Sequence, residues 1–315
     1  MTVPLPGVPL TEHAAMLGRL QDAGYGDFWT SEVRGFDALT PLPALAAAAP
    51  GARLGAAIAG VYSRGPALLA MQAAAVSAAA PGRFALGIGT SSETIVEGWN
   101  DRRFERPLAR TRDSLRFLRS ALAGERIDQR YETFSVRGFS LEHPPEIPPP
   151  ILVAALRERM LELAGREADG VCLGMLGAED VARVIPIVNR AGRTVEVFLR
   201  VAVVVRRDAS RARRAARRLI GPYLAAGPYA RFHEWLGRGD EIAKIRAGFA
   251  AGDRDAVEAA IPDALVDSIV VHGEPDACRA GLQAFLDAGV TTLCIDVVGS
   301  DSERLEAQQA VIPRS

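Results

Sequence analysis

Lysine is almost absent from the sequence. Of 37 basic residues, Lys244 is the one lysine, and it lies in a charged stretch beside Asp240 and Glu241. A catalytic lysine needs a desolvated pocket that lowers its pKa, so we do not expect Schiff-base chemistry. The formal net charge of −1 gives no basic field that would attract nucleic acid or an anionic membrane surface. We therefore expect a small-molecule substrate as the partner, with no nucleic acid and no membrane.

Cysteines and long apolar runs are also scarce. Cys172, Cys278 and Cys294 show no CxxC spacing, which predicts reduced core residues rather than disulfides. No basic segment followed by an apolar one marks a signal peptide. No apolar run approaches the roughly 18 residues that a membrane span needs. These absences predict a cytoplasmic protein.

Common metal, nucleotide and hydrolase motifs are missing. The histidines are scattered, and His233-Glu234 does not continue into an HExxH motif because residue 237 is glycine. Neither a GxxxxGK[ST] loop nor a GxSxG elbow occurs. The segment 87–92 follows a predicted strand, as a dinucleotide-binding loop would, but it lacks the third glycine. We therefore expect no metal and no Rossmann-type nucleotide site.

Alternation of short apolar segments with helical ones is the dominant pattern, and it favours a parallel α/β sheet. The predicted strands are 27–30, 53–60, 83–88, 151–155, 169–173, 195–205 and 291–297. The predicted helices are 10–23, one opening at 40–41, 66–80, 105–123, 157–165, one beginning at 208, and 274–288. Thr11 and Thr40 are candidate N-caps, and Gly124 is the expected end of its helix.

Three segments interrupt this alternation, and we interpret them as insertions at about 90–104, 130–148 and 221–262. A barrel also requires a strand before the first helix, and we expect a short, imperfect one within residues 1–5, which include Pro4. The predicted fold is α/β: a single-domain (β/α)8 TIM barrel spanning residues 1–315. The alternative is an open doubly wound sheet.

Three stretches have a distinctive order and spacing. The first is AGYGDFWTSE at 23–32, and the second runs from LGAAIAGVYSRGP at 54–66 to GRFALGIG at 82–89. The third joins PPILVAAL at 149–156 to MLELAG and ADGV, which end at residue 171. Together with DAGVTT at 287–292, they resemble the luciferase-like monooxygenase superfamily, and more narrowly its coenzyme F420-dependent oxidoreductases, over almost the whole chain.

The resemblance implies an enzyme that transfers a hydride between coenzyme F420, a deazaflavin, and an unknown small organic substrate at the C-terminal mouth of the barrel. One alternative is a two-component monooxygenase of the same family that uses FMN and O2. A second alternative is a non-catalytic flavin-binding barrel. Relatives often form homodimers through helices near the second and third strands, so a homodimer is also expected.

Glu32 is the predicted catalytic acid–base residue. It ends the second-strand segment, where the resemblance places the reactive face of the cofactor, and Asp37 follows on the same loop. Several relatives carry a histidine beside this acidic position. Here the neighbour is Val33, so that proton relay is absent. A solvated loop carboxylate is the alternative interpretation of Glu32.

The cofactor ring is expected at the carboxyl ends of the strands, where small residues leave room for a flat group. The resemblance implies a cis peptide between Ala57 and Ile58 that backs the ring. Hydroxyls after the next strand are candidates for contacts to its polar edge. The alternatives are close packing and strand-end turns. The predicted ring-binding residues are Ala57, Ile58, Ala59, Gly87, Gly89, Thr90 and Ser91.

Two helix starts are candidates for the cofactor phosphate, because helix N-termini bind anions. Many relatives carry glycine where Arg157 stands, and a surface arginine is the alternative interpretation of that residue. The predicted residues are Ala154, Ala155, Leu156, Arg157, Gly174 and Met175.

Aromatic side chains on the loops are candidates for the wall of a substrate pocket. They are Phe36, Tyr62, Trp99 and Trp235. Arg64 is a candidate contact for an anion near the cofactor. Packing of loops onto the barrel is the alternative role for the aromatic residues, and strand-end capping is the alternative for Arg64.

Overall fold

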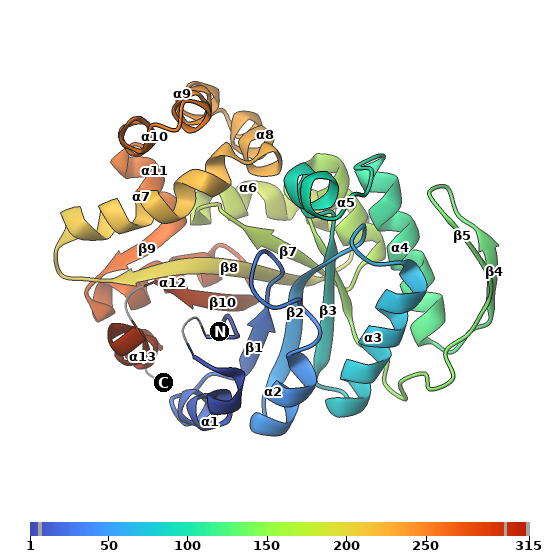
Figure 1. Cartoon of the computed structure of the whole chain (residues 1–315). Coiled ribbons are helices and arrows are strands. Elements are labelled where there is room, and N and C mark those ends of the chain that lie inside the picture. The colour runs from blue at the N-terminus through green and yellow to red at the C-terminus, as the bar shows by residue number, and fades with distance from the viewer. Residues whose placement is uncertain (6–7, 299–300, 313–315) are drawn as a thin grey trace. The chain divides into compact units, whose positions relative to one another are not determined.

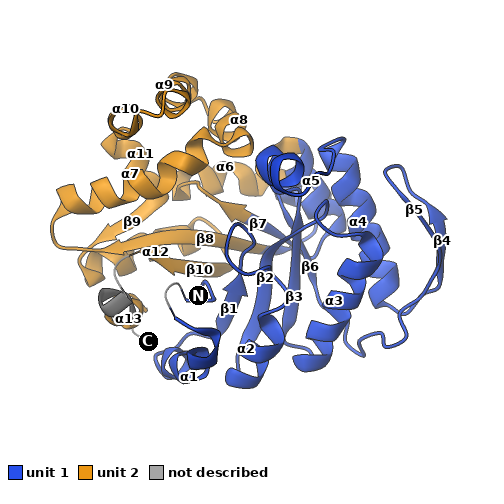
Figure 2. Cartoon of the chain, viewed as in Figure 1, with its two compact units in different colours: residues 1–155, 159–172, 188–196 blue, residues 156–158, 173–187, 197–315 orange. Residues whose placement is uncertain are grey.

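The computed structural model describes residues 1–5, 8–298 and 301–312. The chain divides into two compact units (Figure 2). Unit 1 comprises residues 1–155, 159–172 and 188–196, and unit 2 comprises residues 156–158, 173–187 and 197–315. The single-domain organisation stays a prediction.

Unit 1 contains a parallel sheet in the order β1 (Asp27–Thr30), β2 (Arg53–Gly60), β3 (Phe84–Gly89), β6 (Ile151–Ala154) and the first part of β7 (Gly170–Gly174) (Figure 1). The predicted strands match these bounds to within one residue. The expected imperfect first strand is a single parallel bridge between Thr2 and Trp29. It is reinforced by the Val3 N–H, which donates to the Trp29 carbonyl at 2.8 Å.

The helices of unit 1 follow the strands as predicted, with two corrections at their starts. Neither Thr11 nor Thr40 caps a helix. The first helix opens with a 3-10 turn, η1 (Leu10–Glu12), before α1 (His13–Asp22). Before α2 (Leu42–Ala48), the Asp37 carboxylate accepts the N–H groups of Leu39 and Thr40, at 2.9 and 3.0 Å, and so closes this turn itself. The remaining helices are α3 (Pro66–Ala79), α4 (Pro107–Leu122) and α5 (Glu158–Glu167), the last of which begins at the edge of unit 2.

Two predicted insertions lie in unit 1. A π-helical turn, η2 (Thr94–Trp99), occupies the first. The second contains an antiparallel hairpin of β4 (Ile127–Arg130) and β5 (Ser135–Phe139), which begins slightly earlier than expected. Gly124 ends the preceding helix with φ +82°, a left-handed conformation that glycine adopts without a Cβ clash.

In unit 2, the long strand β8 (Glu196–Val205, of which Glu196 belongs to unit 1) pairs with a strand on each side. Phe198–Val203 pair with β10 (Thr292–Val297), and Ala202–Val205 pair with β9 (Val270–Gly273), all in parallel. The sequence did not predict β9, because it follows α11 (Asp263–Ile269) with no turn residue between them. The flanking helices of unit 2 are α6 (Ala178–Val188), α12 (Pro275–Asp287) and α13 (Asp301–Ala310).

The third insertion is helical, as the sequence indicated, and its glycine and proline residues divide it into several short helices. It comprises the end of α7 (Ala209–Ala225), then α8 (Gly227–Trp235), α9 (Gly239–Ala250) and α10 (Arg254–Ala260). Asp208 caps α7 by accepting the Arg211 N–H at 3.0 Å. Ala212, Ala216, Ile220 and Leu224 recur every four residues along one face of α7 and pack with Ala202 and Val204 of β8 in one buried cluster. Within the described residues, no helix is long and apolar enough to cross a membrane.

Candidate active site

The carboxyl ends of the adjacent parallel strands in unit 1 bring the predicted ring-binding residues to one edge of the sheet. The peptide bond between Ala57 and Ile58 is cis, which confirms what the resemblance implied. The register of β2 against β3 shifts between Ala56 and Ala59 at this point. The cis bond therefore coincides with a bulge at the end of β2.

The glycines at the end of β3 accommodate Ile58. A Cβ atom added to Gly87 would lie 2.3 Å from the Ala56 carbonyl oxygen and 3.2 Å from Ile58 Cγ2. One added to Gly89 would lie 2.8 Å from Ala154 Cβ and 3.1 Å from Ile58 Cδ1. Glycine is therefore required here because Ile58 and the neighbouring strands fill the space. The interpretation that these glycines leave room for direct approach of a ligand needs this correction: Ile58 is the residue positioned between them.

Glu32 and Arg64 form a closed ion pair in unit 1. Arg64 Nη1 and Nη2 donate to the two Glu32 carboxylate oxygens at 2.8 and 2.5 Å. The Ala38 N–H donates to Oε2 at 3.1 Å, and Arg64 Nη2 also contacts Asp37 at 3.3 Å. The side chains of Arg64 and Glu32 are only 9% and 17% exposed. Burial opposes the charge on Arg64, but its carboxylate partners raise its pKa.

This arrangement favours an anchoring role for Glu32. A bidentate guanidinium occupies both carboxylate oxygens of Glu32. A group held in this way is poorly placed to exchange a proton with a substrate. The acid–base role of Glu32 stays a prediction, whereas its contacts show that it holds Arg64. A Cβ atom added to Gly60 would press on Ser63 Oγ at 2.9 Å but would meet Glu32 Oε1 at an ordinary contact distance of 3.5 Å.

The residues after β3 have strained backbone and accessible hydroxyls. Ser91 has φ +61°, which is uncommon for a residue with a Cβ and concentrates at functional sites. Thr90 Oγ1 donates to the Ser91 carbonyl at 3.3 Å, and Ser92 Oγ accepts the Ile95 N–H at 3.4 Å. Thr90 and Ser91 are partly exposed, so their cofactor-binding role stays a prediction that the geometry permits.

The predicted aromatic residues of unit 1 differ in their surroundings. Tyr62 is 8% exposed, and its hydroxyl donates to the Glu105 carbonyl at 2.6 Å. Burial raises the pKa of Tyr62 to about 12, so the phenol stays protonated and packs the loop. Phe36 and Trp99 are each 51% exposed. They are the better candidates for a substrate wall, a role that stays a prediction.

The predicted phosphate residues at the start of α5 and the end of β7 include open positions. Ala155 belongs to unit 1 and donates its N–H to the Cys172 carbonyl at 3.2 Å. Leu156 is half-buried and Arg157 is exposed in unit 2. Among the residues that the structure describes, Arg157 has no hydrogen-bond or ion-pair partner. A Cβ atom added to Gly174 would meet nothing within 4 Å.

A buried polar network in unit 2 holds the loop after β7. Met175 has φ +59°, and its carbonyl accepts a hydrogen bond from His233 Nε2 at 2.9 Å. His233 Nδ1 accepts from Arg238 Nη1 at 3.0 Å, and Arg238 Nη2 donates to Asp180 at 2.9 Å. Asp180 in turn accepts the Gly177 N–H at 3.1 Å. The network thus fixes one neutral tautomer of His233 and the start of α6.

Burial, with Arg238 as the second cause, lowers the pKa of His233 to about 4. This histidine was considered in the sequence only as a failed zinc motif. Met175, which accepts from His233, and Asp180, which accepts from Arg238, each lie 58 residues from their donor, so no local pattern reveals the network. Trp235 on the same helix is 39% exposed and stacks on Phe232, with ring centroids 6.0 Å apart. Its substrate-binding role stays a prediction.

A second arginine–carboxylate pair also escaped the sequence analysis. Arg200 of β8 donates to Asp296 of β10, and the two side chains are 27% and 24% exposed. Burial opposes the charge on Arg200, but Asp296 raises its pKa. The signal was present, because each is the only charged residue in an otherwise apolar segment, FLRVAVVV and TLCIDV. Charges in such strands are costly unless they are paired, and they concentrate at functional sites.

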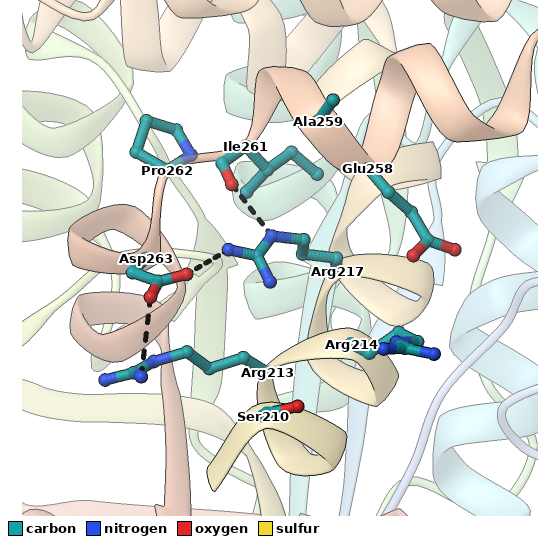
Figure 3. Close-up of a pocket in the computed structure, with 9 residues that line it drawn as sticks. All are labelled: Ser210, Arg213, Arg214, Arg217, Glu258, Ala259, Ile261, Pro262 and Asp263. Atoms are coloured by element: carbon teal, nitrogen blue, oxygen red, sulfur yellow. Dashed lines mark hydrogen bonds and ion pairs between the residues drawn. The ribbon is translucent and has the colours of Figure 1, made fainter.

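A surface hollow of about 410 Å³ in unit 2 contains none of the predicted site residues (Figure 3). Arg217 there donates to the Ile261 carbonyl at 2.8 Å and to Asp263, and Arg213 also contacts Asp263, at 3.4 Å. These arginines link α10 and α11 to α7. We therefore interpret the hollow as the junction between these helices. Its lining residues are Ser210, Arg213, Arg214, Arg217, Glu258, Ala259, Ile261, Pro262 and Asp263.

The chain is similar to known proteins over nearly its full length. A Mycobacterium tuberculosis protein, whose name assigns it provisionally to the coenzyme F420-dependent oxidoreductases, is 29% identical over 94% of this chain and 93% of its own. The 5,10-methylenetetrahydromethanopterin reductase of Methanolobus tindarius is 27% identical over 92% of this chain and 91% of its own. The solved F420-dependent tetrahydromethanopterin reductase of Methanopyrus kandleri superposes with a TM-score of 0.81 at 19% identity, covering 99% of this chain and 96% of its own.

The family model described as luciferase-like monooxygenase matches residues 2–292. The predicted α/β barrel is confirmed as the fold, and the open doubly wound alternative is set aside. The strand ends of unit 1, with the cis bond at Ala57–Ile58, are therefore at the mouth where this fold places its active sites. This chain belongs to the luciferase-like monooxygenase family.

Proposed function

We propose that this protein is an oxidoreductase that transfers a hydride between coenzyme F420 and a small organic substrate. The packing of Ile58 against Gly87 and Gly89, at the carboxyl ends of β2 and β3, carries the proposal. Relatives named as F420-dependent enzymes support the choice of cofactor, among them a glucose-6-phosphate dehydrogenase of Amycolatopsis mediterranei that is 25% identical over 88% of this chain.

The residues at the strand ends fit a flat ring. Ile58 fills the space above the two glycines of β3, and the residues around it, Ala57, Ala59 and Ala154, are small. F420, when bound, supplies the ring carbon that gives or takes the hydride. Ile58 would back the ring, and the hydroxyls of Thr90 and Ser91 would bind polar groups at its edge. The phosphate-binding role of Arg157, which belongs to unit 2, stays a prediction.

Cofactor binding tests this proposal directly. Purified protein is titrated with F420 and, separately, with FMN, and binding is followed by fluorescence quenching. We expect F420 to bind more tightly than FMN. Gly89→Val, which would press on Ile58 and Ala154, should weaken F420 binding at least tenfold. The matched control Gly65→Val lies where an added Cβ meets nothing within 4 Å and should bind as the wild type does.

The same titrations decide between the alternatives. Tight FMN binding without F420 binding would favour the two-component monooxygenase, which the family model's description also supports. Binding of neither cofactor would favour a non-catalytic barrel. The substrate is left open by the relatives, whose names cover both a pterin reductase and a sugar-phosphate dehydrogenase.

We further infer that the protein forms a homodimer through α3. This helix contains no charged residue, and Leu68 and Met71 on one face are 50% and 53% exposed. Exposed apolar side chains on neighbouring turns are typical of an interface. Light scattering should show a dimer for the wild type and a monomer for Met71→Glu, and a monomeric wild type would overturn this inference. The cytoplasmic location stays a prediction.

A further inference from the structure

Arg200, which pairs with Asp296, keeps N–H donors that have no hydrogen-bond partner among the described residues. We propose that Arg200, Tyr223 and Tyr229 form a binding site for a carboxylate group of the substrate. The identification of that ligand as the substrate rests on the proposed function, whereas the binding site itself does not.

The strand geometry places Arg200 on the face of β8 that the helices cover. Side chains alternate along a strand, so Arg200 shares its face with Ala202 and Val204, which pack against α7, α8 and α9. Cys294 is the register partner of Arg200 on β10, and Asp296 is the partner of Ala202. The charged pair therefore lies on the strand face packed against α7 and α8, which follow each other across a junction at Ala226.

Two tyrosines lie at that junction. Tyr223 near the end of α7 and Tyr229 of α8 meet edge to face, with ring centroids 5.8 Å apart. Both rings are half-buried. The charge on Arg200 interacts with both phenols, and burial raises the pKa of Tyr229. The phenol of Tyr229 is therefore a protonated donor at neutral pH.

The donors in this cluster are largely unused. A guanidinium has five N–H donors, and Arg200 donates one hydrogen bond, from Nη2 to Asp296 Oδ2. Within the described part of the chain, the Tyr223 and Tyr229 hydroxyls have no hydrogen-bond partner. None of these donor atoms is among the fully buried side-chain atoms that lack a partner, so they reach solvent, and a ligand rich in acceptors can replace the water there.

A carboxylate fits this requirement best. Its two oxygens match the planar fork of a guanidinium and can also accept from both phenols. Asp296 accepts from only one Nη atom of Arg200 and orients the guanidinium plane. A neutral amide has a single acceptor oxygen and should bind less well.

Benzoate is the probe for this site, with benzamide as its neutral isostere, and both are titrated calorimetrically into the full-length protein. We expect wild-type protein to bind benzoate at least tenfold more tightly than benzamide. Tyr229→Phe should weaken benzoate binding about tenfold, and Tyr223→Phe/Tyr229→Phe should weaken it further. Tyr131→Phe, which removes a phenol from unit 1, is the matched control and should bind as the wild type does.

Variants of Arg200 give a second, independent measurement. Arg200→Lys keeps the charge but loses the planar fork, so its affinity for benzoate should be intermediate. The neutral double variant Arg200→Met/Asp296→Leu leaves no unpaired charge in the fold and should abolish binding, with folding checked by thermal unfolding. Benzoate binding that is no tighter than benzamide binding, or that survives loss of both phenols, would overturn the proposal.

F420 affinity is measured in the same proteins. The tyrosine variants should retain it. Failure of the wild type to bind F420 would contradict the proposed function, while the benzoate titration would still decide on the carboxylate site.

Discussion

The two units each contain an arginine–carboxylate pair, and the two pairs differ in how far their hydrogen bonds are satisfied. In unit 1, Arg64 occupies both oxygens of Glu32, and the Ala38 N–H and Asp37 complete the set. In unit 2, Arg200 makes one hydrogen bond to Asp296 beside two phenols. We call a pair closed when its hydrogen bonds are satisfied within the fold, and open when some of its donors have no partner. A closed pair fixes the loops to which its residues belong, whereas an open pair can still donate to a ligand. The contacts of Glu32 therefore show that it holds Arg64, while its acid–base role stays a prediction.

Breaking the closed pair should have the largest effect. Arg64→Met leaves the Glu32 carboxylate buried and unpaired, and we expect a loss of about 3 kcal/mol in the free energy of unfolding. Urea denaturation measures this loss. Arg34 is exposed and lies on the loop that contains Glu32. As a control, Arg34→Met should change the free energy of unfolding by less than about 0.5 kcal/mol. Equal effects of the two substitutions would show that the pair does not anchor the loop.

Lowering the pH should have the next-largest effect on stability, through the His233 network of unit 2. The pKa of His233 is lowered from 6.5 to about 4 by burial and by Arg238. The stabilisation from neutral His233 is therefore complete above pH 6.5 and is lost as the pH falls through 4. Between these pH values the wild type should lose about 3 kcal/mol more than His233→Gln does.

Urea denaturation at several pH values checks this dependence. The charged groups that face the ring are Arg238, which bonds to Nδ1, and Asp180, which bonds to Arg238. Carboxylates elsewhere titrate in both proteins, so their contribution cancels in the comparison. Parallel curves for the two proteins would rule out the network as the source of acid sensitivity.

Two glycines at strand ends allow a similar comparison, because one is tightly packed and the other has open space around it. A Cβ atom on Gly87 would lie 2.3 Å from a backbone oxygen, whereas one on Gly174 meets nothing within 4 Å. Gly87→Ala should therefore cost about 1–3 kcal/mol, and Gly174→Ala should cost almost nothing. Thermal unfolding of the two variants measures the difference, and comparable melting temperatures would contradict it.

The sequence predicted what depends on local pattern. Strand β2 was predicted at its observed bounds, because its apolar run is bounded by turn residues. The cis bond at Ala57–Ile58 followed from the resemblance. Strand β9 was missed because its four residues continue directly from a helix. The His233 network and the Arg200–Asp296 pair were missed because they join residues 58 and 96 positions apart, and only the fold brings these together.

Removal of a single phenol hydroxyl should have the smallest effect on stability. It compares a hydroxyl that is hydrogen-bonded within the fold directly with one that is not. The Tyr62 hydroxyl donates to a backbone carbonyl at 2.6 Å, so Tyr62→Phe should cost about 1 kcal/mol in the free energy of unfolding. The Tyr229 hydroxyl has no partner among the residues described here, so Tyr229→Phe should leave stability unchanged within about 0.5 kcal/mol. Urea denaturation of both variants separates the two cases. If Tyr229→Phe lowered the free energy of unfolding as much as Tyr62→Phe does, the Tyr229 hydroxyl would already be hydrogen-bonded within the fold. The pair in unit 2 would then be closed, like the pair in unit 1.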